Sequence, residues 1–412
     1  MNNLKIKVYD AHVFINSITI AIMCTSNLLL YLLMYLFNYN NGFYGIMGTV
    51  FGLFLISMVL YRSISKSNLI SVSFLLLLVF LLYAVSSIFG RIGEVSVISF
   101  LGFCILPIIC SLLEKDVKVI LESILIISLL VLPVSNQLFE YQYVTLRQVD
   151  MSRAYAVFIT ISAAAIHFCW YRKGSNILIK IAYIANIYLL YKLLSVGNRG
   201  IIASVAFLIF VLMLRYIRQS NIAAAKRRTM TILFIIFGIF VVLLILNIDR
   251  IIIYLYNYFH SLGGTIPSFV IKMYKLIVYK SDISNGRDEV YDFFLRKVFE
   301  QPIIGYGMKM SSVVSNGQYP YPHNYILQML FEGGIIFAVY PVIISLRIIF
   351  VTLLKKSNAL QYELLLVFLL CNCIPKLLLS GDMWMQPILW LWLGIAATNF
   401  AQERKKNEKQ KA

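Results

Sequence analysis

The chain has 412 residues, of which 60% are hydrophobic and only 13% charged, and its formal net charge is +18. A composition this apolar excludes a soluble globular protein and predicts a polytopic membrane protein. The positive charge does not indicate a nucleic-acid-binding protein, because the basic residues are dispersed through the loops between apolar runs and no DNA- or RNA-binding motif accompanies them.

The apolar runs are long enough to cross the hydrocarbon layer of a bilayer, where backbone groups must be paired within helices. Hydropathy therefore predicts an all-α fold with about twelve transmembrane helices. The first nine are expected near Val13–Phe37, Phe43–Tyr61, Leu69–Phe89, Val95–Leu113, Val119–Val134, Ala154–Tyr171, Ile177–Leu194, Ile201–Leu214 and Met230–Asn247. The last three are expected near His323–Phe350, Leu360–Leu379 and Trp384–Phe400.

These spans divide the chain into four parts. Residues 1–247 carry spans one to nine, 248–322 form one large loop, 323–402 carry spans ten to twelve, and 403–412 are a basic tail. Lysines and arginines fall on alternate connections between spans, and basic loops stay on the cytoplasmic side. Both termini are therefore predicted to be cytoplasmic, and the large loop is predicted to face outward.

Two amphipathic helices are predicted in this loop. Thr265–Lys280 and Asp288–Glu300 both place apolar residues at helical spacing, and the first is expected to lie along the membrane surface. Ser284 and Asn285 are capping candidates for the second helix, which the proline after Gln301 should end. The following segment, as far as Pro322, is predicted to be irregular and to fold over the outer mouth of the bundle.

His323 is the candidate catalytic base. It follows two prolines and is expected in the first turn of the tenth span, where the positive end of the helix dipole disfavours a protonated imidazole. A neutral imidazole can accept a proton from a hydroxyl nucleophile, and the same helix end, with Asn324, attracts phosphate oxygens. The alternative interpretation is a histidine that only anchors the helix at the interface.

Charged residues near the outer membrane edge are costly and are therefore functional candidates. Arg199, Arg287 and Arg147 suit a diphosphate, because the guanidinium makes two charge-assisted hydrogen bonds to one phosphate. For each arginine the alternative is contact with lipid headgroups or a loop carboxylate, and we expect such an anchoring role for Arg153. Glu332 is a further binding candidate, although a polar contact inside the bundle is the preferred interpretation, with the adjacent glycines allowing another helix to approach.

No paired-carboxylate D-x-D motif occurs, and the outward carboxylates are not spaced like the ligands of a cation. The sequence therefore predicts a mechanism without a metal or another cofactor.

Four motifs occur in a fixed order on the predicted outward side. They are S-V-G-N-R-G at 195–200, S-N-G-R at 284–287, P-I-I-G-Y-G at 302–307 and P-H-N-Y-I-L-Q-M-L-F-E-G-G at 322–334. In this order they resemble the O-antigen polymerase and O-antigen ligase superfamily. The resemblance implies an enzyme at the outer face of the bacterial inner membrane that uses a polyprenyl-diphosphate-linked glycan as donor and a sugar hydroxyl as acceptor, without metal or nucleotide sugar.

The resemblance also implies residue roles. The reaction would be an inverting glycosyl transfer in which His323 is the general base, while Arg199 and Arg287 hold the departing lipid diphosphate. Arg147 is the weakest match, because the glycine and the asparagine-proline pair often seen after this arginine are missing. The context of Gln328 and the moderately short outer loop favour a polymerase of undecaprenyl-diphosphate-linked repeat units over a ligase that transfers the glycan to lipid A core. A chain-length regulator protein is a further implied partner.

A transporter or flippase of lipid-linked oligosaccharides is the competing class, because it too would have about twelve spans. Such transporters tend to contain two matched halves with broken helices near the membrane midplane. The sequence shows no internal repeat, and its polar candidates gather at the outer edge, which favours an enzyme.

Overall fold

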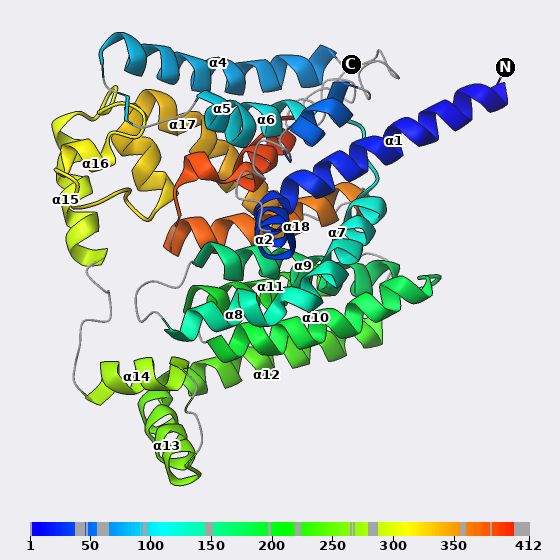
Figure 1. Ribbon diagram of the computed structural model, residues 1–412, viewed down its shortest axis with the longest axis vertical. Helices are drawn as coiled ribbons and strands as arrows, with labels where there is room; N and C mark the ends of the chain where they lie inside the picture. Colours follow the sequence, from blue (N-terminus) through cyan, green and yellow to red (C-terminus); the bar gives the residue numbers. More distant parts are fainter. Residues whose placement is uncertain are drawn as a thin grey trace.

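A computed structural model describes residues 2–37, 46, 48–55, 66–90, 92–93, 97–144, 151–196, 199–218, 224–263, 266, 268–278, 287–354, 360–379 and 381–398. Every regular element in these ranges is a helix, which confirms the all-α prediction (Figure 1).

Most helices in the first half of the chain overlap the predicted spans, although the helix at Ser135–Val144 was not predicted. Of the second predicted span, Phe43–Tyr61, only residues 46 and 48–55 are described. The helices are α1 (Asn2–Cys24), α2 (Ser26–Phe37), α4 (Lys66–Ile88), α5 (Val97–Phe100), α6 (Leu106–Cys110), α7 (Val117–Val131), α8 (Ser135–Val144), α9 (Met151–Tyr171), α10 (Ile177–Val196), α11 (Arg199–Arg218) and α12 (Ala224–Leu246). The segment between α12 and α17, which is predicted to face outward and is called the outer segment below, contains α13 (Ile248–Ser261), α14 (Ser268–Val278), α15 (Arg287–Glu300) and α16 (Ser311–Val314). It is followed by α17 (Tyr325–Leu354), α18 (Leu360–Leu379) and a last apolar helix, Pro387–Thr398.

Within the described ranges, six helices are long and apolar enough to cross a membrane. They comprise Val117–Phe139, Arg153–Tyr171, Ile177–Ser195, Gly200–Arg218, Tyr325–Leu353 and Gln361–Leu378. Three shorter apolar helices, Val72–Ile88, Leu101–Cys110 and Pro387–Thr398, accompany them. The chain is thus a multi-pass membrane protein, and the count of twelve spans stays a prediction.

The first predicted span is not one straight helix. α1 and α2 are bent by 71° at the break between them, so that they form either a broken span or a re-entrant turn. Thr25 lies at this break, and its hydroxyl donates a hydrogen bond of 2.8 Å to the carbonyl of Ala21. A threonine that bonds back to the preceding turn bends a helix, which accounts for a break that hydropathy does not detect.

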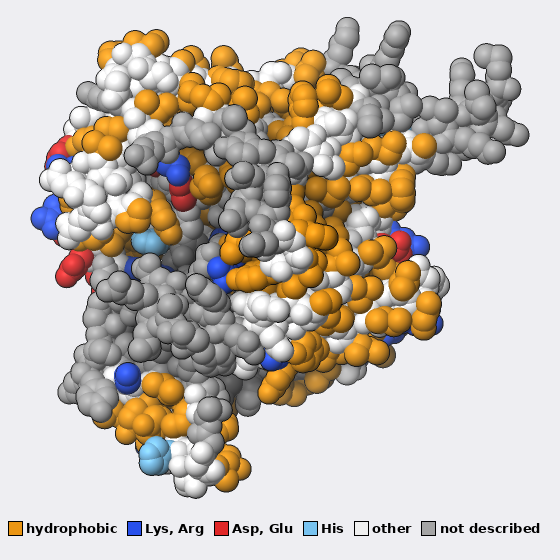
Figure 2. Space-filling model, in the orientation of Figure 1, with side chains coloured by type: hydrophobic (Ala, Val, Ile, Leu, Met, Phe, Trp, Pro, Cys, Tyr) orange, Lys and Arg blue, Asp and Glu red, His pale blue; other side chains and the backbone are white. Residues whose placement is uncertain are grey.

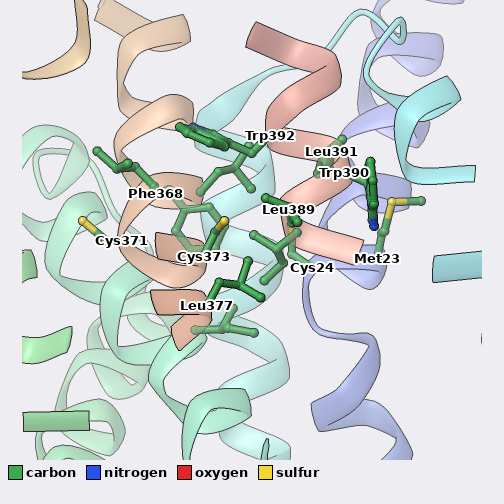
Figure 3. Packing of buried hydrophobic residues seen from close by; sticks show 14 of the residues in the cluster. Met23, Cys24, Phe368, Cys371, Cys373, Leu377, Leu389, Trp390, Leu391 and Trp392 are labelled. Carbon is green, nitrogen blue, oxygen red and sulfur yellow. The ribbon is translucent and has the colours of Figure 1, made fainter. Parts of the chain in front are cut away.

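Part of the core lies between α1, α18 and the last helix (Figure 3). Phe368 of α18 and the indoles Trp390 and Trp392 of the last helix are fully buried there. Helices at the edge of the bundle instead expose apolar side chains, such as Ile184 (70% exposed) and Ile187 (69%) on α10. This distribution fits a bundle surrounded by lipid, because burial inside the protein and contact with lipid both suit apolar side chains.

A buried ion pair aligns three helices. Arg215, in the last turns of α11, pairs with Glu363 at the start of α18 and donates 3.0 Å to the carbonyl of Thr352 at the end of α17. Arg199 and Leu379 are each 16 residues from this ion pair, or about 24 Å along a helix. The start of α11 and the end of α18 therefore lie together at the opposite end of the bundle, which we call the site end.

The segment 302–307, P-I-I-G-Y-G, packs against a break in α17. Gly334 has φ 62° and ψ −168°, outside helical values. Around it, the amide of Tyr306 donates 2.8 Å to the carbonyl of Phe331, and the amide of Ile335 donates 2.9 Å to the carbonyl of Pro302. Gly334, together with Gly305 of the segment itself, thus allows an irregular stretch of backbone to approach, and not a second helix as the sequence suggested.

Replacement of Gly334 by alanine is expected to destabilise this contact strongly. An added Cβ would overlap the carbonyl of Ile303 at a positive φ, which L side chains rarely adopt. We expect a loss of about 2–4 kcal/mol, visible as a lower midpoint of thermal unfolding in detergent. Gly238→Ala in α12, where nothing lies within 4 Å of the added atom, is the matched control. Equal unfolding midpoints for the two variants would contradict the close contact of Gly334 with the 302–307 segment.

The outer segment contains both predicted amphipathic helices, as α14 and α15, and one that was not predicted, α13. α15 ends at Glu300, as expected from the proline at 302, whereas the capping candidates Ser284 and Asn285 lie outside the described residues. α13 and α14 lie together beside the end of α12 (Figure 1), with the rings of Tyr256 and Tyr274 stacked 3.8 Å apart. The position of α14 along the membrane surface stays a prediction.

Candidate active site

His323 lies just outside α17 and not in its first turn. The helix begins at Tyr325, and the Asn324 side chain caps it by accepting hydrogen bonds from the amides of Ile326 (3.0 Å) and Leu327 (3.2 Å). Asparagine is a preferred N-cap residue, so the helix starts one residue after it. His323 precedes the cap with a left-handed φ of 59°. Two of the first-turn amides of α17, which the sequence predicted to attract phosphate oxygens, therefore already donate to Asn324.

The imidazole of His323 is half-buried beside a positive charge. Burial, and then the charge of Arg287, lower the pKa of His323 to about 4. The predicted neutral form is thus present at neutral pH, with burial as the leading cause. Its Nδ1 atom is buried and has no hydrogen-bond partner within the described ranges, while its ring lies 4.3 Å from that of Tyr321. A neutral nitrogen without a partner is suited to accept a substrate proton.

Arg287 reaches His323 because α15 packs alongside the start of α17. The apolar contact between the two helices consists of Val290, Phe294, Val298, Leu327 and Phe331. The rings of Phe294 and Phe331 meet edge to face at 4.8 Å. Arg287 is seven residues before Phe294, and His323 is eight before Phe331. Both polar residues therefore lie at the same end of this helix pair.

The same arginine also approaches the bundle. The charge of Arg287 acts on Tyr155 in α9, which lies beside Ser204 of α11. Arg199 begins α11, one turn before Ser204, at the site end; its side chain is outside the described atoms. Arg147 lies outside the described residues altogether. In Figure 2 a hollow in the visible face gathers a histidine with basic and acidic side chains.

Glu332 is fully buried in a polar network. Its carboxylate accepts hydrogen bonds from the Gln328 amide (2.8 Å) and the Trp384 indole (2.5 Å). The same Gln328 amide donates 2.8 Å to Asp382, which pairs with Lys309 at 2.5 Å. These contacts join the segment around Lys309 and the loop at 381–385 to the first turns of α17. They agree with a polar contact inside the bundle, the preferred interpretation of Glu332.

Comparison with known protein families yields one match. Residues 184–340 match the family described as O-Antigen ligase. This segment belongs to the O-antigen ligase family. The match runs from α10 into α17 and includes Arg199, Arg287, His323 and Glu332. It confirms the resemblance to the O-antigen polymerase and ligase superfamily and makes the chain a membrane enzyme of the O-antigen ligase or polymerase type. A search among curated proteins yields no match.

Sequence reasoning missed one charged residue at the site end of this enzyme of the O-antigen ligase or polymerase type. Lys376 lies in α18 within the candidate span Gln361–Leu378 and is only 8% exposed. A lysine inside an apolar run is costly in a membrane, so the argument applied to the arginines could have found it. Arg153, expected to be an anchor, places its guanidinium 5.4 Å from the ring centre of Tyr31 and 5.6 Å from that of Tyr35.

In the part of the chain that the structure describes, no group of three or more His, Cys, Asp or Glu residues is arranged to hold a metal ion. The independence of the enzyme from metal stays a prediction from the sequence. What its described side chains offer is a neutral base, a neighbouring guanidinium and a buried polar framework that fixes the start of α17.

Proposed function

We propose that the protein is a polymerase of O-antigen or a related surface polysaccharide, which joins undecaprenyl-diphosphate-linked repeat units by inverting glycosyl transfer. The observation that carries this proposal is the neutral His323, whose Nδ1 has no partner within the described ranges, beside the charge of Arg287. The family match over the segment that contains both residues supports a lipid-linked glycan as substrate. The basic loops of the sequence support a site on the outward face of the inner membrane.

In the proposed reaction, His323 takes the proton of an acceptor hydroxyl as its oxygen attacks the anomeric carbon of the donor sugar. The bond from that carbon to the phosphate oxygen breaks on the opposite face, so that the configuration inverts. The electron pair leaves with the lipid diphosphate, whose negative charge Arg287 and Arg199 stabilise. In this scheme the negative charge of the leaving diphosphate does not need a metal.

A ligase that transfers the glycan to lipid A core is the second candidate. The description of the matching family, O-Antigen ligase, favours it, whereas the context of Gln328 and the short outer loop favour a polymerase. The two activities use the same donor and the same leaving group. They differ only in the acceptor, so the product distinguishes them.

The products in cells that lack the protein separate these candidates. Surface glycans would be resolved on a gel from a lipopolysaccharide-producing strain with the gene deleted, and from the same strain complemented with the wild-type protein. A polymerase predicts that the deletion removes the ladder of long chains and leaves one repeat unit on the core. A ligase predicts core without any repeat unit. An unchanged ladder in the deletion strain would contradict both. Deletion of a chain-length regulator, the further predicted partner, should alter only the distribution of lengths.

A further inference from the structure

Helix α13 projects from the flank of the bundle at the site end. α11 and α12 contact each other and are joined by residues 219–223, a connection too short to cover the length of a second helix, so α12 runs back toward the site end. α13 follows α12 and contacts it. In Figure 1 it runs across the direction of α10, which is long and apolar enough to cross the membrane. α13 is therefore oriented like a helix that lies in the plane of the membrane.

One side of α13 is packed against its neighbours. Ile252 is buried, and the ring of Tyr256 stacks on that of Tyr274 in α14 at 3.8 Å. Ile252 and Tyr256 are four residues apart and so lie on the same side of the helix. This packed side fixes the directions in which the other side chains of α13 point.

An exposed apolar stripe runs along α13 beside the packed side. Tyr254, Tyr258 and Leu262, the residue that directly follows the helix, are 68%, 48% and 62% exposed. They follow one another at intervals of four residues, so they share one side. The rings of Tyr254 and Tyr258 lie nearly parallel, with centres 6.3 Å apart. The stripe is a continuous apolar surface that the described part of the chain leaves uncovered.

A polar side of α13 borders this stripe. Arg250, Asn257 and Ser261 are all exposed, and they lie about 80° around the helix from the apolar stripe. A helix with this division lies in the interface of a membrane, with its polar side toward water and its apolar side among acyl chains. Tyrosine suits that level, because its ring is apolar and its hydroxyl is polar.

The stripe also continues a surface that suits lipid. Leu243 and Leu246, in the last turns of α12, are exposed, and α13 begins at Ile248. Further along α12, Ile232, Ile235 and Ile239 are exposed as well. An apolar surface on a membrane bundle contacts acyl chains. Phospholipid is therefore the occupant that the surroundings of the stripe favour over a glycan or another protein.

We propose that α13 is an interfacial anchor, which inserts Tyr254, Tyr258 and Leu262 between the phospholipids of the leaflet at the site end. Its polar side, with Arg250 and Asn257, remains in contact with headgroups and water. The sequence predicts a surface position for α14 only, and the anchor gives α13 a defined side that faces lipid. It is independent of the proposed function, because α13 carries none of the site residues.

The test measures the surroundings of α13 with a nitroxide spin label on the full-length protein in phospholipid nanodiscs. The label is attached through Tyr258→Cys in a Cys169→Ser background, because Cys169 is the one exposed cysteine of the six. Its relaxation is measured with oxygen, which concentrates among acyl chains, and with a water-soluble nickel chelate. We expect oxygen to dominate, at a depth of about 5–10 Å below the headgroup phosphates.

Asn257→Cys is the matched control. Position 257 is the neighbouring residue on the same helix but lies about 100° around it, on the polar side, so its label should respond mainly to the nickel chelate. Ile184→Cys, on the exposed side of α10, gives the response of a label that faces lipid within a span.

Two results would overturn the anchor. A label at position 258 that responds to the nickel chelate as strongly as the label at position 257 would place the stripe in water, where a glycan could bind it. Protection of position 258 from both reagents would show a protein contact, such as a second copy of the chain.

The unmodified protein decides the matter if the cysteine variants do not fold. It would be illuminated in vesicles that contain a phospholipid with a diazirine in its acyl chain, and the adducts would be mapped by mass spectrometry. Adducts on Tyr254, Tyr258 or Leu262 would support the anchor. Adducts on α10 and α12 without any on α13 would contradict it.

Discussion

Replacement of His323 by asparagine is expected to lower turnover about 10²-fold to 10⁴-fold, the contribution of a general base. Asparagine adopts a left-handed backbone more readily than most residues, so this variant keeps the φ of 59° at position 323 while it removes the base. The measurement is the release of undecaprenyl diphosphate from lipid-linked repeat units by the purified protein in vesicles.

Two further variants separate chemistry from conformation. His323→Gly relaxes the backbone at the positive φ and should be as inactive as the asparagine variant, because neither carries a base. His260→Ala removes another histidine of the outer segment, one whose ring stacks on Tyr256 in α13, and should leave the turnover unchanged. Full activity of His323→Asn would show that position 323 serves the loop conformation and not proton transfer.

Loss of the positive charge at position 287 is expected to change both the rate and its pH dependence. Arg287→Gln should lower kcat/KM about 10²-fold to 10³-fold, the effect of removing one group that stabilises developing negative charge. The charge of Arg287 lowers the pKa of His323, so its removal should raise that pKa from about 4 toward the usual 6.5. The acidic limb of the kcat/KM profile should therefore move to higher pH.

Arg287→Lys is the control for this second prediction. Lysine keeps the charge but loses the planar fork that binds a phosphate through two hydrogen bonds. Its rate should fall while the acidic limb stays close to that of the wild type. If Arg287→Gln left the acidic limb of the kcat/KM profile unchanged, the charge of Arg287 would not act on His323. That result would contradict the arrangement of the site.

The low pKa of His323 is compatible with a role as base. A bound diphosphate would carry negative charge to Arg287 and so offset the positive charge that lowers the histidine pKa. The pKa would then rise toward the pH at which the enzyme works, where a general base is most effective. The donor would thus help to prepare the base for the acceptor hydroxyl.

The sequence alone determined where most of the long helices lie and which residues are the candidates for the chemistry. Apolar runs predicted α7, α9, α10, α11 and α18 within a few residues, because in lipid only a helix pairs all of its backbone groups locally. The neutral state of His323 was also predicted, and the family match covers the motifs that suggested the resemblance.

Only the tertiary structure decided the contacts that depend on distant residues. The packing of the 302–307 segment on Gly334 arises from backbone hydrogen bonds between residues far apart in sequence. The bend at Thr25 and the position of His323 before the Asn324 cap arise from local side-chain hydrogen bonds that average hydropathy does not detect. The surroundings of Lys376 also depend on the tertiary structure, because its neighbours Asn27, Tyr155 and Gln386 come from three other parts of the chain. Hydropathy is a local property and sets helices, whereas a site requires side chains whose separation in sequence says nothing about their separation in space.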